Sequence, residues 1–142
     1  MGLLTKFRES IFTWRRPKTL GQQGEDAAAR FLKRLGYLIV ARSERDRIGE
    51  IDLVAVDGRT VVFVEVKTRN STIAGQPAEA VDEHKQRKLT RLALAYLRRH
   101  DLLECHSRFD VVSVLWPRDE KRPTIEHFKN AFEPDGQGQM FS

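Results

Sequence analysis

The sequence predicts an α/β fold in which helices flank a mixed central sheet. Three observations lead to this prediction: apolar residues recur at helical spacing in two segments, apolar runs typical of buried strands lie between them, and two further strand patterns follow. The expected order is helix, three strands, helix and two strands. With 142 residues, of which 40% are hydrophobic, the chain is large enough to bury one core.

Both ends of the chain differ from residues 21–133, which we expect to fold as one domain. Residues 1–20 combine apolar residues at roughly helical spacing with several positive charges, and they are interpreted as a basic amphipathic arm that Pro17 ends. Such an arm suits contact with nucleic acid, a partner or a membrane surface, or it is a loosely attached segment without separate function. Residues 134–142 are rich in Gly and Gln and are expected to be disordered.

The first helix is expected over residues 22–35, where an apolar stripe is followed by Gly36, a good C-terminal cap. Glu25 lies in the first turn, near the edge of the inward face. The helix dipole alone favours a glutamate at this place, so its position has a structural explanation as well as a functional one. A strand over residues 37–42 follows, and the charged stretch 43–47 is expected to be a loop or bend.

Residues 51–56 and 61–67 are expected to form the two strands of a β-hairpin. The segment between them, residues 57–60, has the sequence Asp-Gly-Arg-Thr, which is a strong turn signal. A two-residue turn in the middle of this segment, or a four-residue loop, places Asp52 directly opposite Glu65. A tighter turn over its first two residues makes them diagonal neighbours on the same face. Apolar residues alternate along both strands, so both faces of the sheet are expected to be covered.

Charged side chains gather on one face of this hairpin, because residues two apart on a strand point the same way. Glu65 shares a face with Lys67, and Glu50 shares one with Asp52. An excess of carboxylates at an otherwise apolar hairpin favours a divalent cation held by oxygen ligands, with a cationic group beside it. The alternative is a structural ion pair between Asp52 and Lys67 near a strand end, with Glu65 exposed at the rim.

The second half of the chain supplies more positive charge beside this hairpin. A polar loop over residues 68–77 begins with Arg69, which either meets a phosphate or remains an ordinary solvated arginine. The second helix is expected over residues 82–100, and Asp82 is a good N-cap. Its first turns include Lys85 and Lys88, which form either a solvated face or a surface that steers phosphates. The last strands are expected over residues 108–116 and 124–132.

Composition limits the kinds of partner and site. The net charge of +5 permits a polyanionic partner without requiring one. Cys105 is the only cysteine, which excludes a disulfide framework and a CxxC zinc site. The four histidines lack ligand spacing and are interpreted as surface or structural residues. No apolar run is long enough to cross a bilayer, and charges interrupt any signal-peptide core, so a cytoplasmic location without a membrane partner is expected.

Four motifs resemble those of the YraN-like bacterial family, which is endonuclease-like and distantly similar to archaeal Holliday-junction resolvases. The motifs are GQQGEDAA from Gly21, GEIDL from Gly49, VEVKTR from Val64 and KQRKL from Lys85. The match covers nearly everything over residues 21–132. Asp52, followed by Glu65 and Lys67, also resembles the active-site pattern of the PD-(D/E)xK nuclease superfamily. Ile51 stands where the superfamily name has proline, a residue that contributes no metal ligand.

The resemblance implies a restriction-endonuclease-like αβββαβ core and a metal-dependent endonuclease that hydrolyses phosphodiester bonds in DNA, including branched or structured DNA. By this resemblance Asp52 and Glu65 would bind Mg²⁺ or Mn²⁺. Lys67 would orient or deprotonate the attacking water, or stabilise the charged transition state, and Glu25 would assist the metal site. Glu50 has no assured counterpart in the superfamily.

Arg69, Lys85 and Lys88 are the candidate DNA contacts. A homodimer is plausible for a junction enzyme, because two cuts need two sites. Two alternatives stay open: a nucleic-acid-binding accessory protein that keeps the fold without turnover, and an interaction module whose partner holds the N-terminal arm.

Overall fold

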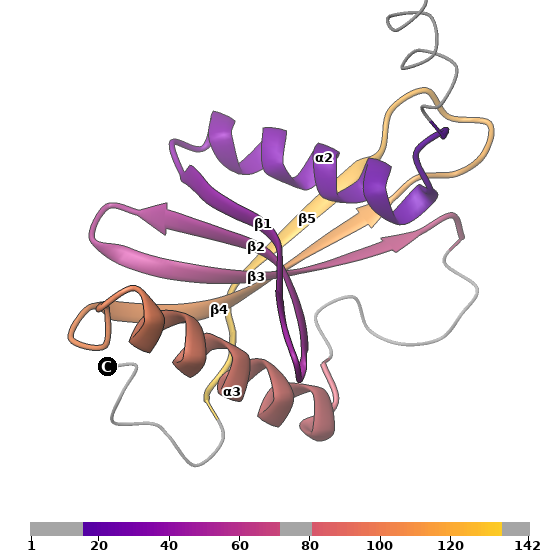
Figure 1. Ribbon diagram of the computed structural model, residues 1–142. Coiled ribbons are helices and arrows are strands. Elements are labelled where there is room, and N and C mark those ends of the chain that lie inside the picture. The colour runs from indigo at the N-terminus through magenta and orange to yellow at the C-terminus, as the bar shows by residue number, and fades with distance from the viewer. Residues whose placement is uncertain (1–15, 72–80, 135–142) are drawn as a thin grey trace, which may run out of the picture.

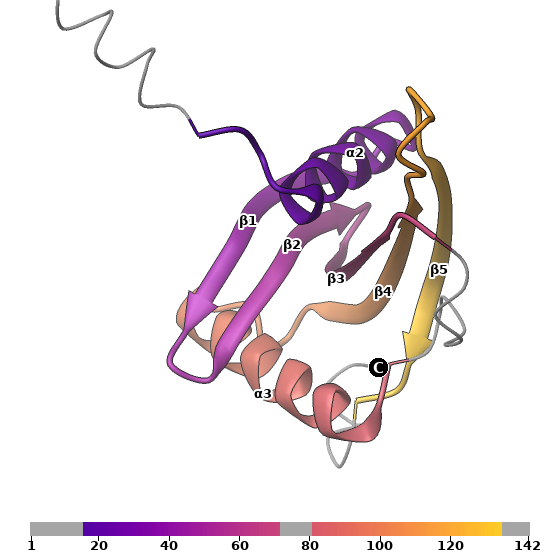
Figure 2. The same ribbon diagram turned by 90° about the vertical axis from the view of Figure 1, so that its right-hand side faces the viewer.

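A five-stranded mixed sheet forms the centre of the computed structural model, and one helix packs against each face (Figures 1 and 2). The strands lie side by side in their order along the chain. The pair β3–β4 is parallel, and the other neighbours are antiparallel. The elements are α2 Leu20–Arg34, β1 Leu38–Asp46, β2 Gly49–Asp57, β3 Thr60–Arg69, α3 Glu83–Arg99, β4 His106–Leu115 and β5 Thr124–Phe132.

The structure describes residues 16–71 and 81–134, so most of the predicted arm and tail lies outside the described residues. Within the described part, the order of elements confirms the predicted αβββαβ core. The helix α3 connects the parallel strands β3 and β4, which need a crossover of this kind. Neither described helix has the length and apolar character needed to cross a membrane.

Two hydrophobic clusters, one on each face of the sheet, hold the helices in place. Under α2, the side chains of Ala28 and Leu32 pack with those of Leu53, Val64 and Val112. Under α3, those of Leu92 and Leu97 pack with those of Val54, Phe63 and Phe109. All ten are at most 3% exposed, and burying each larger side chain contributes about 1.5–3 kcal/mol. Neighbours such as Leu53 and Val54 enter opposite clusters, which confirms that both faces of the sheet are covered.

Each helix begins at a side-chain cap, and the caps fix the positions of the first turns. At α2, Thr19 Oγ1 accepts a hydrogen bond from the Gln22 amide (3.2 Å), and Gln22 Oε1 accepts one from the Thr19 amide (3.0 Å). At α3, Asp82 Oδ1 accepts from the Lys85 amide (2.8 Å), which confirms Asp82 as the N-cap. The side chains of Glu25 and Lys85 therefore project from fixed positions in the first turns of α2 and α3.

The β2–β3 hairpin has the register predicted for a two-residue turn. Asp57 pairs with Thr60, so Gly58 and Arg59 form the turn, and the ladder continues to the pair Leu53–Val64. Gly58 has a φ of +61°, a left-handed conformation that glycine adopts without steric cost. The ladder ends one pair short of Asp52 and Glu65, which come next in this register on the two strands.

The prediction of a loop or bend over residues 43–47 was wrong, because β1 continues through this charged stretch to Asp46. The pairs Glu44–Ile51 and Arg45–Glu50 keep it in the sheet. As an edge strand, β1 exposes many of its side chains to solvent, so charged residues do not oppose strand formation. A bulge between Ile39 and Ala41 interrupts the alternation on which a sequence-based assignment depends.

The polar loop expected from residue 68 also begins later than predicted. Strand β3 continues to Arg69 because the parallel partner β4 extends beside it, with the pairs Thr68–Val114 and Arg69–Leu115. A backbone hydrogen bond from the Trp116 amide to the Arg69 carbonyl (2.7 Å) prolongs this contact. Polar residues therefore occupy the end of a strand here.

A buried ionic network joins β4 and β5 beneath the end of α2. Asp110 is 0% exposed and accepts hydrogen bonds from Arg108 Nε (3.0 Å) and the Asn130 amide (3.0 Å), and it contacts His127 Nε2 at 2.8 Å. Burial alone would raise the pKa of Asp110, but His127, Arg108 and the Asn130 amide outweigh it, and the pKa is lowered. Arg108 also donates to Tyr37 Oη (2.7 Å). His127 is therefore a structural residue, as predicted.

Candidate active site

Strands β2 and β3 separate at Asp52 and Glu65. Their ladder ends at the pair Leu53–Val64, after which β2 continues beside β1, and β3 continues beside β4. Figure 1 shows the β1–β2 hairpin turning away from the end of β3. The two acidic residues thus occupy the point of divergence, where side chains from both strands reach the space that the ladder no longer fills.

Asp52 is held at this point by the opposite strand. Its Oδ2 accepts a hydrogen bond from the Val66 amide of β3 (2.8 Å). Burial, and then the negative charge of Glu65, raise the pKa of Asp52 to about 7, despite the opposing effect of the Val66 bond. At neutral pH this carboxyl group therefore exchanges a proton readily, and a nearby cation would favour its ionised form.

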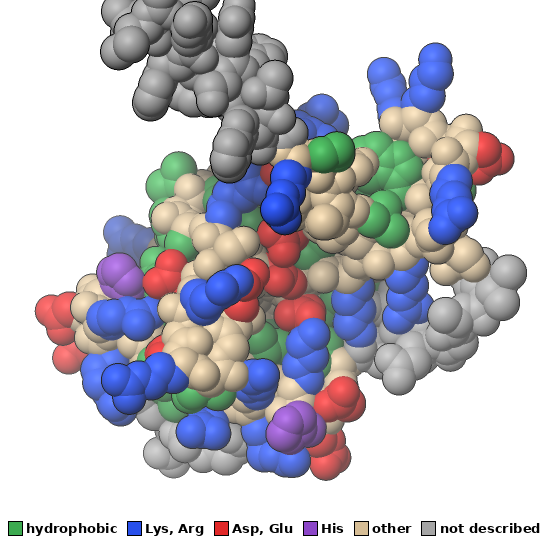
Figure 3. Space-filling view, turned by 45° about the vertical axis from the view of Figure 1, so that its right-hand side comes forward, with side chains coloured by type: hydrophobic (Ala, Val, Ile, Leu, Met, Phe, Trp, Pro, Cys, Tyr) green, Lys and Arg blue, Asp and Glu red, His purple; other side chains and the backbone are tan. Residues whose placement is uncertain are grey.

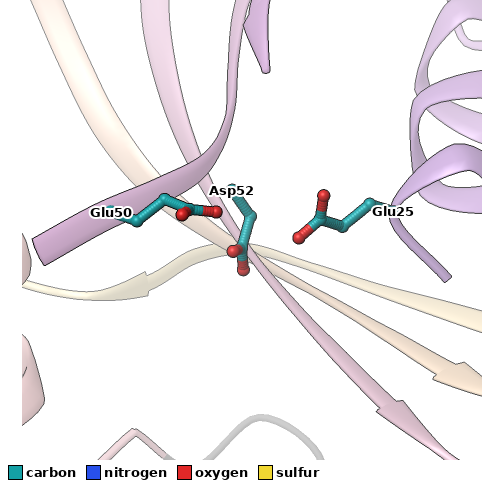
Figure 4. A group of neighbouring side chains, drawn as sticks. All are labelled: Glu25, Glu50 and Asp52. Atoms are coloured by element: carbon teal, nitrogen blue, oxygen red, sulfur yellow. The ribbon is translucent and has the colours of Figure 1, made fainter. Parts of the chain in front are cut away.

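Two further carboxylates point toward Asp52 from different elements. Glu25 comes from α2 and Glu50 from β2, and one ligand oxygen of each residue lies within 4.8 Å of the others (Figure 4). Burial, and then the charge of Glu50, raise the pKa of Glu25 above its ordinary value. Ser43 Oγ donates a weak hydrogen bond to Glu25 (3.4 Å), and Arg45 pairs with Glu50 at 3.0 Å. We call Glu25, Glu50 and Asp52 the carboxylate cluster.

Glu65 lies beside the carboxylate cluster and is paired with a cation from α3. It is only 7% exposed, and its Oε1 forms an ion pair with Lys85 Nζ. Burial alone would lower the pKa of Lys85, but its hydrogen bond to Glu65 and the charge of that residue outweigh burial, so the pKa is raised. The structure therefore places Glu65 close enough to Asp52 for its negative charge to raise the pKa of Asp52.

Lys67 projects from β3 two residues after Glu65, and it is partly buried. Burial, and then the positive charge of Arg69, lower the pKa of Lys67 below its ordinary value. The charges of Glu65 and Asp82 oppose this change. A lysine of this kind loses its proton more readily than a solvated one, which suits a group that orients or deprotonates water.

The remaining candidate DNA contacts lie around this site. Arg69 is the last residue of β3, and it is partly buried near Lys67. Lys88 is exposed on α3 and its side chain crosses Gly49, where an added Cβ would meet Lys88 Cε at 2.6 Å. Figure 3 shows one face of the molecule, where acidic side chains gather in the middle and Lys and Arg side chains lie on either side of them. This charge pattern suits a phosphate that approaches a bound cation.

The structure thus places Glu25 beside Asp52, and it places Glu65 within electrostatic reach of both Asp52 and Lys67. It also has two features that sequence reasoning did not assign to the site. Glu50 joins the carboxylate cluster; its spacing of two residues from Asp52 was the available signal. The ion pair of Lys85 with Glu65 had no local signal, because twenty residues separate the two in the sequence. The candidate ion pair between Asp52 and Lys67 is not among the ion pairs of the described residues.

Comparison with known proteins gives the family. The model described as "Uncharacterised protein family UPF0102" matches residues 24–114, which include the site. A UPF0102 protein of Rhodopirellula baltica is 55% identical over 120 residues, covering 82% of this chain and 72% of its own length. UPF0102 proteins of Geobacter sulfurreducens (49%) and Nocardia farcinica (50%) are matched over 82% and 81% of this chain, and over 90% of each relative. The chain therefore belongs to the UPF0102 family, which is the YraN family that its motifs predict.

Proposed function

We propose that this protein is a divalent-cation-dependent nuclease that hydrolyses phosphodiester bonds in DNA, including branched or structured DNA. The observation that carries the proposal is the convergence of the carboxylate cluster with Glu65 and Lys67 where β2 and β3 separate. Carboxylates this close repel one another unless a proton or a cation lies between them. The fold and the family membership agree with the proposal, and they do not by themselves establish an activity.

The residues present fit a hard divalent cation. Mg²⁺ and Mn²⁺ prefer oxygen ligands, and Mg²⁺ is often held by one or two carboxylates together with waters. Two oxygens bound to one Mg²⁺ at about 2.1 Å lie at most about 4.2 Å apart. The 4.8 Å within which the cluster's ligand atoms lie therefore calls for only a small side-chain movement. Asp52 would be the central ligand, with Glu25, Glu50 or Glu65 completing the set.

The protein's own residues then divide the chemistry. A bound cation would act as a Lewis acid toward the phosphoryl oxygen and neutralise developing negative charge. Lys67, with its lowered pKa, would orient or deprotonate the attacking water. Lys85 and Arg69 would hold the flanking phosphates, as Lys and Arg do in most protein–DNA contacts. The expected products are a 5′-phosphate and a 3′-hydroxyl.

The test is cleavage of junction, flap and duplex DNA with Mg²⁺ or Mn²⁺. We expect Asp52→Asn and Lys67→Met each to lower the rate by at least about 100-fold. The exposed residues Glu104 and Lys33 lie outside the site, so Glu104→Gln and Lys33→Met serve as matched controls with wild-type rates. Cleavage that survives both site substitutions would show that the activity comes from a contaminant, and the assignment would fall.

A second candidate function is DNA binding without turnover. The ion pair between Lys85 and Glu65 favours it, because this pair occupies a carboxylate that a cation could use. Calorimetry with Mn²⁺ separates the two candidates. Salt-dependent DNA binding without any heat of Mn²⁺ binding would support the second candidate and contradict the first.

A further inference from the structure

A basic groove lies between α2 and the β4–β5 connection, and the hydrolysis described above does not use it. It consists of two adjoining hollows of about 540 and 360 Å³ that share Trp116 and Lys121. In Figures 1 and 2 the β4–β5 connection runs beside α2. The first hollow also contains Leu20, Gln23 and Asn70.

Positive charge dominates this groove. Its lining includes the five cations Arg30, Arg34, Arg118, Lys121 and Arg122, and only one carboxylate, Glu120. The ion pairs formed within residues 16–71 and 81–134 involve none of the five cations. Cations that line two adjoining hollows without an ion-pair partner among the described residues are available to neutralise an external anion. The groove therefore has the charge expected for contact with phosphates.

Trp116 gives the groove an aromatic wall held in a fixed position. Its indole Nε1 donates to the Glu120 carbonyl (3.0 Å), and its backbone amide donates to the Arg69 carbonyl (2.7 Å). The side chain also packs against the hydrophobic cluster under α2, so it spans from the core to the groove. An aromatic ring held beside cations suits a nucleobase, because every base can stack on it while phosphates meet the charges.

Two residues that line the groove are close neighbours of site residues along the chain. Gln23 lies two residues before Glu25 on α2, and Asn70 lies three residues after Lys67. Three residues of chain span at most about 11 Å, so Asn70 cannot lie far from the reacting centre. A strand of nucleic acid at the site would therefore reach the groove within a few nucleotides.

We propose that this groove binds a single-stranded segment of the DNA next to the point of cleavage, with a base against Trp116 and phosphates against the five cations. A base inside a duplex is stacked and cannot meet an aromatic wall within a hollow, so the occupant is an unpaired strand. The proposal rests on the proposed nuclease function for the identity of the nucleic acid. The binding itself needs no metal and no turnover.

The test is fluorescence anisotropy of a labelled 15-nucleotide oligo(dT) and of a 15-base-pair duplex with the full chain in EDTA. Trp116→Leu is expected to weaken oligo(dT) binding by about 5- to 100-fold, with a smaller effect on the duplex, while Trp116→Phe keeps most of the affinity. Lys121→Ala and Arg122→Ala should each reduce the salt slope by about 0.7. Arg59→Ala is the matched control, because Arg59 is exposed in the β2–β3 turn.

A second measurement does not depend on how well the Trp116→Leu variant folds. The chain has two tryptophans, so Trp14→Phe leaves Trp116 as the only one, and oligo(dT) should quench its fluorescence. The proposal is overturned if oligo(dT) does not bind, if binding leaves this fluorescence unchanged, or if the groove variants bind like Arg59→Ala.

The two proposals can fail separately. Binding that depends on Trp116 in a protein that never cleaves DNA would contradict only the nuclease function. Cleavage that depends on Asp52, together with oligo(dT) binding that does not depend on Trp116, would contradict only the groove.

Discussion

The backbone amide of Val66 donates a 2.8 Å hydrogen bond to the carboxylate of Asp52, across the point where β2 and β3 separate. The bond links the two strands after their ladder has ended, and it orients the residue at the centre of the carboxylate cluster. Asp52 consequently has both a structural partner on β3 and two acidic neighbours from α2 and β2. The Val66 amide stabilises the ionised form of Asp52, whereas burial and the acidic neighbours Glu65 and Glu25 oppose ionisation.

Asp52→Asn should abolish Mn²⁺ binding without destabilising the fold. The amide side chain keeps an oxygen that accepts from Val66, and it removes a charge that is costly to bury. We expect a melting temperature equal to or above that of the wild type in EDTA, and no heat of Mn²⁺ binding in calorimetry. A variant that melts well below the wild type, or still binds Mn²⁺ with wild-type affinity, contradicts this role for Asp52.

The raised pKa of Asp52 predicts how stability depends on pH without metal. The pKa rises from an ordinary value of 3.8 to about 7 on folding, so the folded state holds this proton more tightly than the unfolded state. The contribution of Asp52 to stability is therefore present at low pH and is lost as pH rises from about 4 to about 7. The free energy of unfolding in urea should be higher for Asp52→Asn than for the wild type, and this difference should grow from pH 5 to pH 7. Equal differences at both pH values would contradict the shift.

Lys85→Met should destabilise the protein in the absence of metal, because it leaves the buried carboxylate of Glu65 without its partner. Removing one member of a buried pair costs about 3–5 kcal/mol, and Lys85 is 48% exposed, so we expect about 1–3 kcal/mol. If Glu65 is a metal ligand, saturating Mn²⁺ should recover part of this loss. Lys33→Met is the control for urea unfolding, and an equal effect of both substitutions would contradict the prediction.

Gly24→Ala and Gly21→Ala should have opposite effects on stability, although both lie in α2. A Cβ on Gly24 would lie 1.9 Å from Thr68 Oγ1 on β3, whereas one on Gly21 meets nothing closer than 3.9 Å. We expect Gly24→Ala to cost about 1–3 kcal/mol through overpacking. Gly21→Ala should gain up to about 1 kcal/mol from helix propensity. Thermal unfolding of both variants tests this, and equal stabilities would contradict the close packing of α2 on β3.

Gly24→Ala should also reduce cleavage, because Glu25 follows directly and would move with the displaced helix. Cleavage at the wild-type rate by this variant would show that the position of Glu25 does not matter for the reaction.

Much of the fold was predictable from the sequence, because its signals are local. The turn at Gly58 and the alternation of apolar residues set the hairpin register, in which Asp52 and Glu65 follow directly after the last ladder pair. The β1 extension was missed because an edge strand tolerates charged side chains, and its sequence then looks like a loop. The end of β3 was missed for a related reason: its polar residues stay in the sheet through their partner β4.

The candidate site was only partly predictable, because its completion depends on contacts between distant segments. Glu65 and Lys67 share a face by strand periodicity, and the predicted hairpin register adds Asp52 to that face. Glu25 was assigned through the family resemblance, and its approach to Asp52 depends on how α2 packs across the sheet. The pairing of Lys85 with Glu65 requires the crossover that returns α3 to the other face. The groove at Trp116 likewise depends on where the β4–β5 connection lies relative to α2.

The separation of β2 from β3 affects how much conformational entropy the site would lose when a cation binds. Beyond the point where they separate, β2 remains paired with β1 and β3 remains paired with β4. The backbone that carries the acidic side chains is therefore regular strand, and no loop has to become ordered. Ligands carried by a pre-organised frame lose little conformational entropy when an ion enters. Crystal structures with and without Mn²⁺ should consequently superimpose closely in the backbone where β2 and β3 separate, and differ mainly in the rotamers of the acidic side chains.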